Sequence, residues 1–365
     1  MKKRWKIQGY LLTFVLITLF LLADNSVARA DSFYDGKMLT IIVASSSTGG
    51  TSKWVRAWQP FFTEALGKDA SVQVIFKPGG GSMLGGNYYA RKVKHDGLTV
   101  LASTGSVVLP WILGNKQVQY DFRKMTPIFA SPVGGIIYTT PEIGKDPMAL
   151  RNPSAPLFSA GKSVIGADLA RVLAFDLLNL DVKFVFGYKS SGDQLKAFLT
   201  KEANLNGISS SGFRSKVQPE VDKGNAVPIF TLGVVTDEGK LVRDSVYKDL
   251  PSTRDVYKSY FGKEPTGEKW NAYKAITTAT WSLQKMLWVF DDVPKAAKDS
   301  LINAFKIIVD KPEFKKAMAK RLGAYPQFIG ENAKAAFFKS ANISPSTRAW
   351  TIKYLQEKWD VRDLE

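Results

Sequence analysis

Short β-rich runs alternate with longer amphipathic runs along this chain, and that alternation limits the folds it can adopt. Three apolar runs between residues 38 and 104 are typical of buried strands: MLTIIVA, SVQVIFK and LTVLAS. Between them lie WVRAWQPFFTEALG, with apolar residues at helical spacing, and PGGGSMLGGNYYARKV, a turn that enters a helix. The pattern returns with VKFVFG, DQLKAFLTKEA and AVPIFTLGV, and the chain ends in helical segments. We therefore predict an α/β fold, in a chain whose 365 residues are enough for two domains.

The first 30 residues have the layout of a secretory signal peptide. Basic residues precede an apolar run from about Leu11 to Leu22, and Ala28 and Ala30 form the Ala-x-Ala pattern of a cleavage site. The alternative is an N-terminal membrane anchor, but the run is short for a span of about 20 residues. We expect a soluble protein exported to the periplasm and cleaved after Ala30, with no cysteine for a lipid anchor or a disulfide.

The mature chain is strongly basic. The whole chain has a formal net charge of +17, and removing the signal segment, with its five basic residues and one acidic residue, leaves +13. The lysines are scattered along helical segments such as PEFKKAMAKRL, and no nucleic-acid-binding motif is recognisable. We therefore expect no nucleic-acid partner, and a basic surface that favours the approach of anions.

Small polar residues follow four of the expected strands. In an open α/β sheet, ligands bind beyond the carboxyl ends of the strands, where small side chains leave room and helix N-termini offer N–H donors to an anion. One such loop could be an ordinary turn or helix cap, but four together predict a site for a small anion. The four groups are Ser46, Ser47, Thr48, Gly49, Gly50, Thr51 and Ser52; Ser103 and Thr104; Tyr188, Lys189, Ser190, Ser191 and Gly192; and Ser209, Ser210 and Ser211.

The sequence contains no recognisable catalytic centre. His95 is the only histidine and the chain has no cysteine, which excludes Cys–His nucleophiles and His-rich zinc sites. A serine hydrolase would need a base, and no G-x-S-x-G motif is present. The residues Gly161, Lys162 and Ser163 match the end of a phosphate loop, but Pro156 stands where its first glycine is required. We predict a binding protein that is not an enzyme and has no cofactor or metal.

Several of these segments resemble the receptors of tripartite tricarboxylate transporters, the Bug or TctC-like family. The matching features are Gly49 and Gly50 in the small-residue loop, the Pro-Gly-rich turn at residues 78–86, and the Asp-Gly-x-Thr motif at residues 96–99. FVFGYKSSGDQ resembles their Pro-Tyr-Lys-Gly loop, although Gly187 replaces the proline. DLPSTRDVY and LWVFDDVPKAAKDSLINAFKIIVDKPEFKKAM extend the resemblance over most of the mature chain, while residues 261–283 fit poorly.

This resemblance implies an α/β periplasmic solute-binding protein of the type II flytrap kind, with a hinge between two lobes. The first lobe would comprise residues 31–134 and 286–365, and the second residues 135–285. The protein, expected to be a monomer, would deliver a small carboxylate to the membrane permease of a tripartite tricarboxylate transporter. In the family, the loops matching residues 46–52 and 188–192 grip the carboxylate; Ser103, Thr104 and residues 209–211 follow from the strand-end argument alone.

One departure from the family concerns ligand choice. Many relatives have an aspartate where this chain has Lys53, and a lysine that points inward would favour a ligand with a second negative charge. The alternative is that Lys53, at the start of a helix, points into water. Two other functions stay open: a sensory subunit that reports carboxylate occupancy to a membrane kinase, and an exported serine hydrolase.

Overall fold

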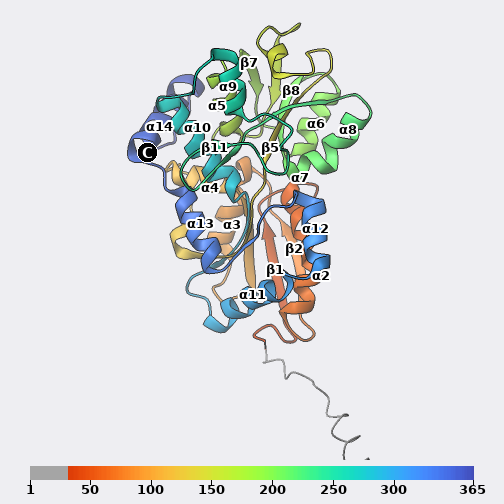
Figure 1. Cartoon of the computed structure of the whole chain (residues 1–365). Coiled ribbons are helices and arrows are strands. Elements are labelled where there is room, and N and C mark those ends of the chain that lie inside the picture. The colour runs from red at the N-terminus through yellow and green to blue at the C-terminus, as the bar shows by residue number, and fades with distance from the viewer. Residues whose placement is uncertain (1–31) are drawn as a thin grey trace, which may run out of the picture. The chain divides into compact units, whose positions relative to one another are not determined.

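The computed structural model describes residues 32–365, so the signal peptide expected at residues 1–30 lies outside the described residues. A six-stranded mixed sheet, here called sheet A, forms the lower part of the molecule in Figure 1. β1, β2 and β3 are parallel, whereas β12 lies antiparallel between β3 and β4. The strands, in spatial order, are β13 Phe328–Ile329, β4 Met125–Ser131, β12 Lys285–Phe290, β3 Thr99–Thr104, β1 Met38–Val43 and β2 Ser71–Phe76.

Helices cover both faces of sheet A, because its strands carry large apolar side chains on both sides. On one face, Trp54, Trp58 and Phe62 of α2 pack on Phe129 of β4 and Phe305 of α11. On the other, Phe122 and Trp288 pack against Phe337 of α13. The helices are α2 Gly50–Leu66, α3 Met83–Lys92, α4 Gly105–Ile112, α11 Lys295–Ile308, α12 Pro312–Leu322 and α13 Glu331–Ala341.

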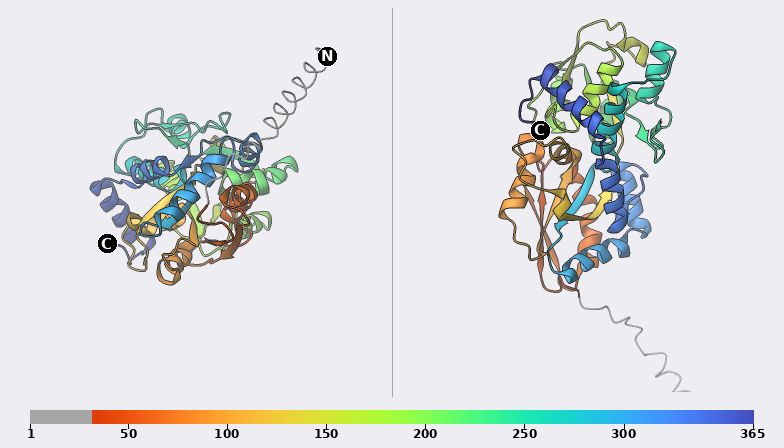
Figure 2. Two further views of the ribbon diagram at one scale, coloured as in Figure 1. Left: turned by 90° about the horizontal axis from the view of Figure 1, so that it is seen from below. Right: turned by 90° about the vertical axis from the view of Figure 1, so that its left-hand side faces the viewer.

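The upper part of the molecule contains smaller sheets (Figures 1 and 2). Sheet B is antiparallel, with β5 between β8 and β9, and sheet C is the parallel pair β6 and β7. The strands are β5 Gly135–Thr139, β6 Leu157–Ala160, β7 Val182–Val185, β8 Leu205–Ser209, β9 Val227–Thr231, β10 Val234–Val235 and β11 Leu241–Val242. The helices are α5 Asp168–Leu177, α6 Ser191–Leu199, α7 Ser210–Gly212, α8 Gln218–Asp222, α9 Thr253–Phe261 and α10 Glu268–Thr277.

Two connections join the sheets near the candidate site. β4 leads directly into β5, and the chain returns to β12 through the π-helical turn η5 Thr278–Ser282. Gly105 at the start of α4 has to be a glycine, since a Cβ there would lie 2.1 Å from the carbonyl oxygen of Thr280 in this turn. The other short turns are η1 Gly80–Ser82, η2 Phe122–Lys124, η3 Pro147–Leu150 and η4 Phe213–Val217.

The last helix, α14 Pro345–Trp359, packs against α10, and Trp359 contacts Phe184 and Phe186 of the sheet C region. Its Arg348 also donates a hydrogen bond to the carbonyl oxygen of Ile112, next to sheet A. The end of the chain thus contacts both parts, while the lobe boundaries given above stay a prediction. Within residues 32–365, no helix combines the length and apolar character needed to cross a membrane.

The strands and helices predicted between residues 38 and 104 are all present, so the α/β prediction is confirmed. The poorly matching segment 261–283 forms α10 and η5, and its Trp281 lines the candidate site.

Candidate functional site

A cavity of about 80 Å³ lies where elements from sheets A, B and C meet. This volume is several times the room that one water molecule needs, so the cavity can admit a small molecule. Its lining is polar and rich in serine and lysine. The lining residues are Ser45, Ser46, Gly49, Gly50, Thr51, Ser82, Thr104, Ser106, Lys162, Ala167, Asp168, Lys189, Ser190, Ser191, Gln194, Gly207, Ile208, Ser209, Trp281, Gln284 and Lys285.

The strand register explains why these residues meet. Val43 and Ala102 are paired in the parallel strands β1 and β3, so the loops that follow the two strands leave the same edge of sheet A. β12 runs the opposite way, and its first residue, Lys285, is paired with Thr104 at the end of β3. Because β12 runs antiparallel to β3, its first residue lies at the edge of sheet A where β3 ends.

Three helix N-termini are directed to the cavity. α2 begins at Gly50 after the cap residue Gly49; α4 begins after Thr104, whose hydroxyl oxygen accepts the N–H of Ser106 at 3.2 Å. α6 begins after Ser190, whose hydroxyl oxygen accepts the N–H of Gly192 at 3.1 Å. The first N–H groups of a helix lack partners within the helix and carry partial positive charge, so this arrangement favours a bound anion.

The structure brings together residues from all four predicted loops. Nine of the predicted site residues line the cavity: Ser46, Gly49, Gly50, Thr51, Thr104, Lys189, Ser190, Ser191 and Ser209.

The remaining predicted residues lie outside the lining. Ser47 and Thr48 are exposed and Ser210 is buried beyond the cavity wall. The others make internal hydrogen bonds: Ser52 Oγ donates to the Ser46 carbonyl, Trp288 Nε1 donates to Ser103 Oγ, Tyr188 Oη donates to Glu202, and the Gly192 N–H donates to Ser190.

Lys53 also lies outside the lining, on α2, and is partly exposed. Burial, and then the positive charge of Arg321, lower its pKa. Its charge also helps to lower the pKa of Lys216 on η4, although burial is the larger cause and brings that pKa to about 8. Lys216 Nζ donates to Ser191 Oγ at 3.1 Å, so one route by which Lys53 influences the cavity runs through this second lysine.

Of the charged groups that line the cavity, the sequence analysis predicted Lys189 but did not assign Lys162, Asp168 and Lys285 to the site. Lys285 is 4% exposed, and burial lowers its pKa to about 7, with the charge of Lys162 as a smaller cause. Among residues 32–365, its Nζ has one weak hydrogen-bond partner, the hydroxyl oxygen of Thr51 at 3.5 Å. Gln284 beside it is also buried, and its side-chain oxygen accepts no hydrogen bond from the described residues.

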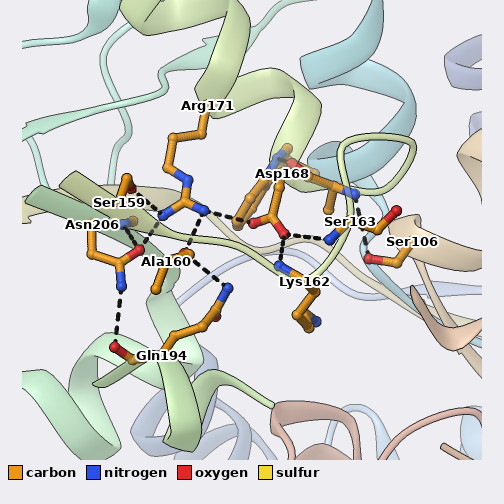
Figure 3. A network of polar contacts seen from close by, with 12 residues as sticks. Ser106, Ser159, Ala160, Lys162, Ser163, Asp168, Arg171, Gln194 and Asn206 are labelled. Carbon is orange, nitrogen blue, oxygen red and sulfur yellow. Dashed lines mark hydrogen bonds and ion pairs between the residues drawn. The ribbon is translucent and has the colours of Figure 1, made fainter. Parts of the chain in front are cut away.

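Asp168 is the one carboxylate among the described residues that line the cavity, and both of its oxygens already have partners within the protein. One of its oxygens accepts the N–H of Lys162 at 2.7 Å, and the other pairs with Arg171 Nη2 at 3.1 Å (Figure 3). The fully buried Arg171 guanidinium also donates to the Ala160 carbonyl and to the Asn206 side chain. The net charge of the cavity wall is therefore positive.

This network also explains the apparent phosphate loop. In such a loop, the N–H groups next to the lysine point to a phosphate. Here those of Lys162 and Ser163 point to Asp168, and only the Lys162 side chain faces the cavity (Figure 3).

No known family model matches the sequence, and no curated protein matches it. Solved structures, however, share its fold. The periplasmic binding protein BugD is similar with a TM-score of 0.63 and 17% identity, over 87% of this chain and 97% of that chain. An R. palustris protein with adipate has a TM-score of 0.62 and 16% identity, over 86% and 97% of the two chains. MatC from Rhodopseudomonas palustris with bound malate has a TM-score of 0.60 and 15% identity, over 84% and 98%.

At 15–17% sequence identity, these structural similarities show that the fold is shared. The chain has the two-lobed α/β fold of periplasmic binding proteins, as the resemblance to the Bug or TctC-like receptors predicts.

Proposed function

We propose that the mature protein is a periplasmic solute-binding protein of the Bug or TctC-like kind, which captures a small organic carboxylate in this cavity. It would pass the carboxylate to the permease of a tripartite tricarboxylate transporter. The observation that carries the proposal is the combination of three helix N-termini and three lysines around one small cavity. Two proteins of the same fold contain malate and adipate, which are small carboxylates.

Neither Asp168 nor His95 is placed to serve as the base of a serine hydrolase in this cavity. A serine nucleophile needs a neighbouring base, and the carboxylate of Asp168 is held by Arg171 and by backbone N–H groups. His95 lies elsewhere, with its Nδ1 2.7 Å from Asp292 and its ring stacked on Phe290. A sensory subunit would have the same cavity, so identifying the membrane partner separates it from a transport receptor.

The first prediction is that at least one small carboxylate raises the melting temperature of the mature protein. A ligand that binds only the native state, at about 100 times its dissociation constant, adds about 2.7 kcal/mol to the free energy of unfolding. A thermal-shift screen of mono-, di- and tricarboxylates measures this directly, and the ligand should be recovered unchanged.

Neutral amides and amines of the same carbon skeletons provide the controls for this screen. Stabilisation by neutral sugars or amines alone, or conversion of the ligand to a product, would contradict the proposal.

A further inference from the structure

The buried Lys285 is a feature that carboxylate binding by helix N-termini does not require. Its side chain is enclosed at the junction of the sheets and directed to the cavity. Among the described residues, no carboxylate pairs with it, and its nearest polar partner is the uncharged Thr51. An ammonium group buried without a counter-ion is strongly unfavourable, so the position calls for an anion that the protein itself does not supply.

The groups that face Lys285 come from several elements, and the one carboxylate among them in the described part of the chain, Asp168, is paired with Arg171. From α2 come Thr51 and the bare backbone of Gly50; a Cβ on Gly50 would lie 3.5 Å from Lys285 Nζ and 4.0 Å from Ser209 Oγ. Thr104 and Ser131 are its neighbours on the adjacent strands. The charged groups of the cavity wall are Lys162, Lys189 and Asp168, and the charge of Asp168 is balanced by Arg171.

We propose that Lys285 selects ligands with two carboxylates: the second carboxylate pairs with the enclosed side chain of Lys285 and supplies the counter-ion that the protein lacks at this position. This proposal rests on the proposed function, since it assigns the first carboxylate to the helix N-termini. A hydrogen bond between an ammonium group and a carboxylate is stronger than one between neutral groups, and it is strengthened further away from water. A monocarboxylate would leave Lys285 without its partner.

The pKa of Lys285 in the empty protein implies that ligand binding takes up a proton. Burial lowers the pKa of Lys285 to about 7 in the empty protein, so most of this amine is neutral at pH 8. A carboxylate beside it favours the charged form and raises the pKa again. Dicarboxylate binding at pH 8 therefore takes up about one proton, and the affinity decreases as the pH rises above 7, because the proton becomes harder to obtain.

The test uses titration calorimetry at pH 8 in two buffers with different ionisation enthalpies. Malate and adipate are the dicarboxylate probes; lactate and hexanoate are their single-carboxylate counterparts. We expect the wild type to take up about one proton per dicarboxylate bound. Lys285→Met should weaken dicarboxylate binding by at least about 100-fold, which is about 2.7 kcal/mol, and abolish the proton uptake. Binding of the single-carboxylate counterparts should change by less than about fivefold.

A matched control and a second variant complete the design. Lys306→Met removes one exposed charge from α11 and should change neither affinity nor proton uptake. Gly50→Asp places a carboxylate beside Lys285 Nζ at a residue without left-handed backbone geometry. It should raise the melting temperature and block dicarboxylate binding. The rise in melting temperature is the part of this result that reports on Lys285, because a new carboxylate stabilises the protein only if the lysine beside it lacks a counter-ion.

The outcomes distinguish this inference from the proposed function. Equal dicarboxylate affinities in the wild type and Lys285→Met, or binding of single carboxylates only, would overturn the role of Lys285 and leave a carboxylate receptor. The absence of binding by any carboxylate would overturn both.

Discussion

Replacing Lys285 by methionine is expected to raise the free energy of unfolding of the empty protein by about 3–5 kcal/mol at pH 7. Burial lowers the pKa of this lysine from 10.5 to about 7, and each unit of that difference corresponds to about 1.4 kcal/mol. Methionine has a similar volume and no charge, so it fills the site without the penalty of burying an ammonium group.

The difference between the pKa of Lys285 in the folded and in the unfolded chain also determines how the stability of the protein changes with pH. Between about pH 7 and 10.5 the unfolded chain holds a proton on Lys285 that the folded chain has lost, so the stability of the wild type rises with pH in this range. Urea unfolding of the wild type, Lys285→Met and Lys306→Met at pH 7 and pH 9 measures the effect. We expect the advantage of Lys285→Met over the wild type to shrink at pH 9. An equal advantage at both values would contradict the titration of Lys285.

Replacing Arg171 by methionine is expected to lower the free energy of unfolding, by an amount of the same order as the gain expected from Lys285→Met. The substitution leaves Asp168, Asn206 and the Ala160 carbonyl without the partner they share in the interior (Figure 3). Removing one member of a buried ion pair typically costs about 3–5 kcal/mol, and the lower end of this range is expected here because Asp168 is partly exposed on the cavity side. The uncompensated Asp168 should also weaken anion binding, since it lines the same cavity.

Urea unfolding and calorimetric titration with the best carboxylate measure both consequences. Arg362→Met is the control, because Arg362 forms an exposed ion pair with Asp360 and such pairs contribute about 0–1 kcal/mol. A loss of stability in Arg171→Met no greater than in this control would show that the buried network contributes little.

The sequence was sufficient to predict several of the elements that build the cavity. Apolar periodicity identified β1, β2 and β3, and the small polar residues after the strands identified loops that meet in the structure. For the loops after β1 and β3 this succeeded because parallel strands end at one edge of a sheet. The loops after β7 and β8 belong to sheets C and B, and they reach the cavity because the three sheets meet there.

The charges of the cavity could not be predicted in this way. Lys285 precedes an apolar run and has the local pattern of a strand that begins in water. It is buried only because β12 is inserted antiparallel between β3 and β4, a pairing between residues more than 150 positions apart. Lys53 was predicted to lie in the site because it follows the small-residue loop in the sequence. The direction of its side chain, however, depends on how α2 is rotated about its axis, and neighbouring residues of a helix point in different directions.

The buried amine of Lys285 has a consequence for the lifetime of the protein. The empty protein bears the cost of burying Lys285 without a counter-ion, so it would open and unfold more readily than the ligand-bound protein. Proteases act on opened chains, so degradation would remove empty receptors first. The amount of receptor present would then follow the supply of its nutrient without any change in synthesis.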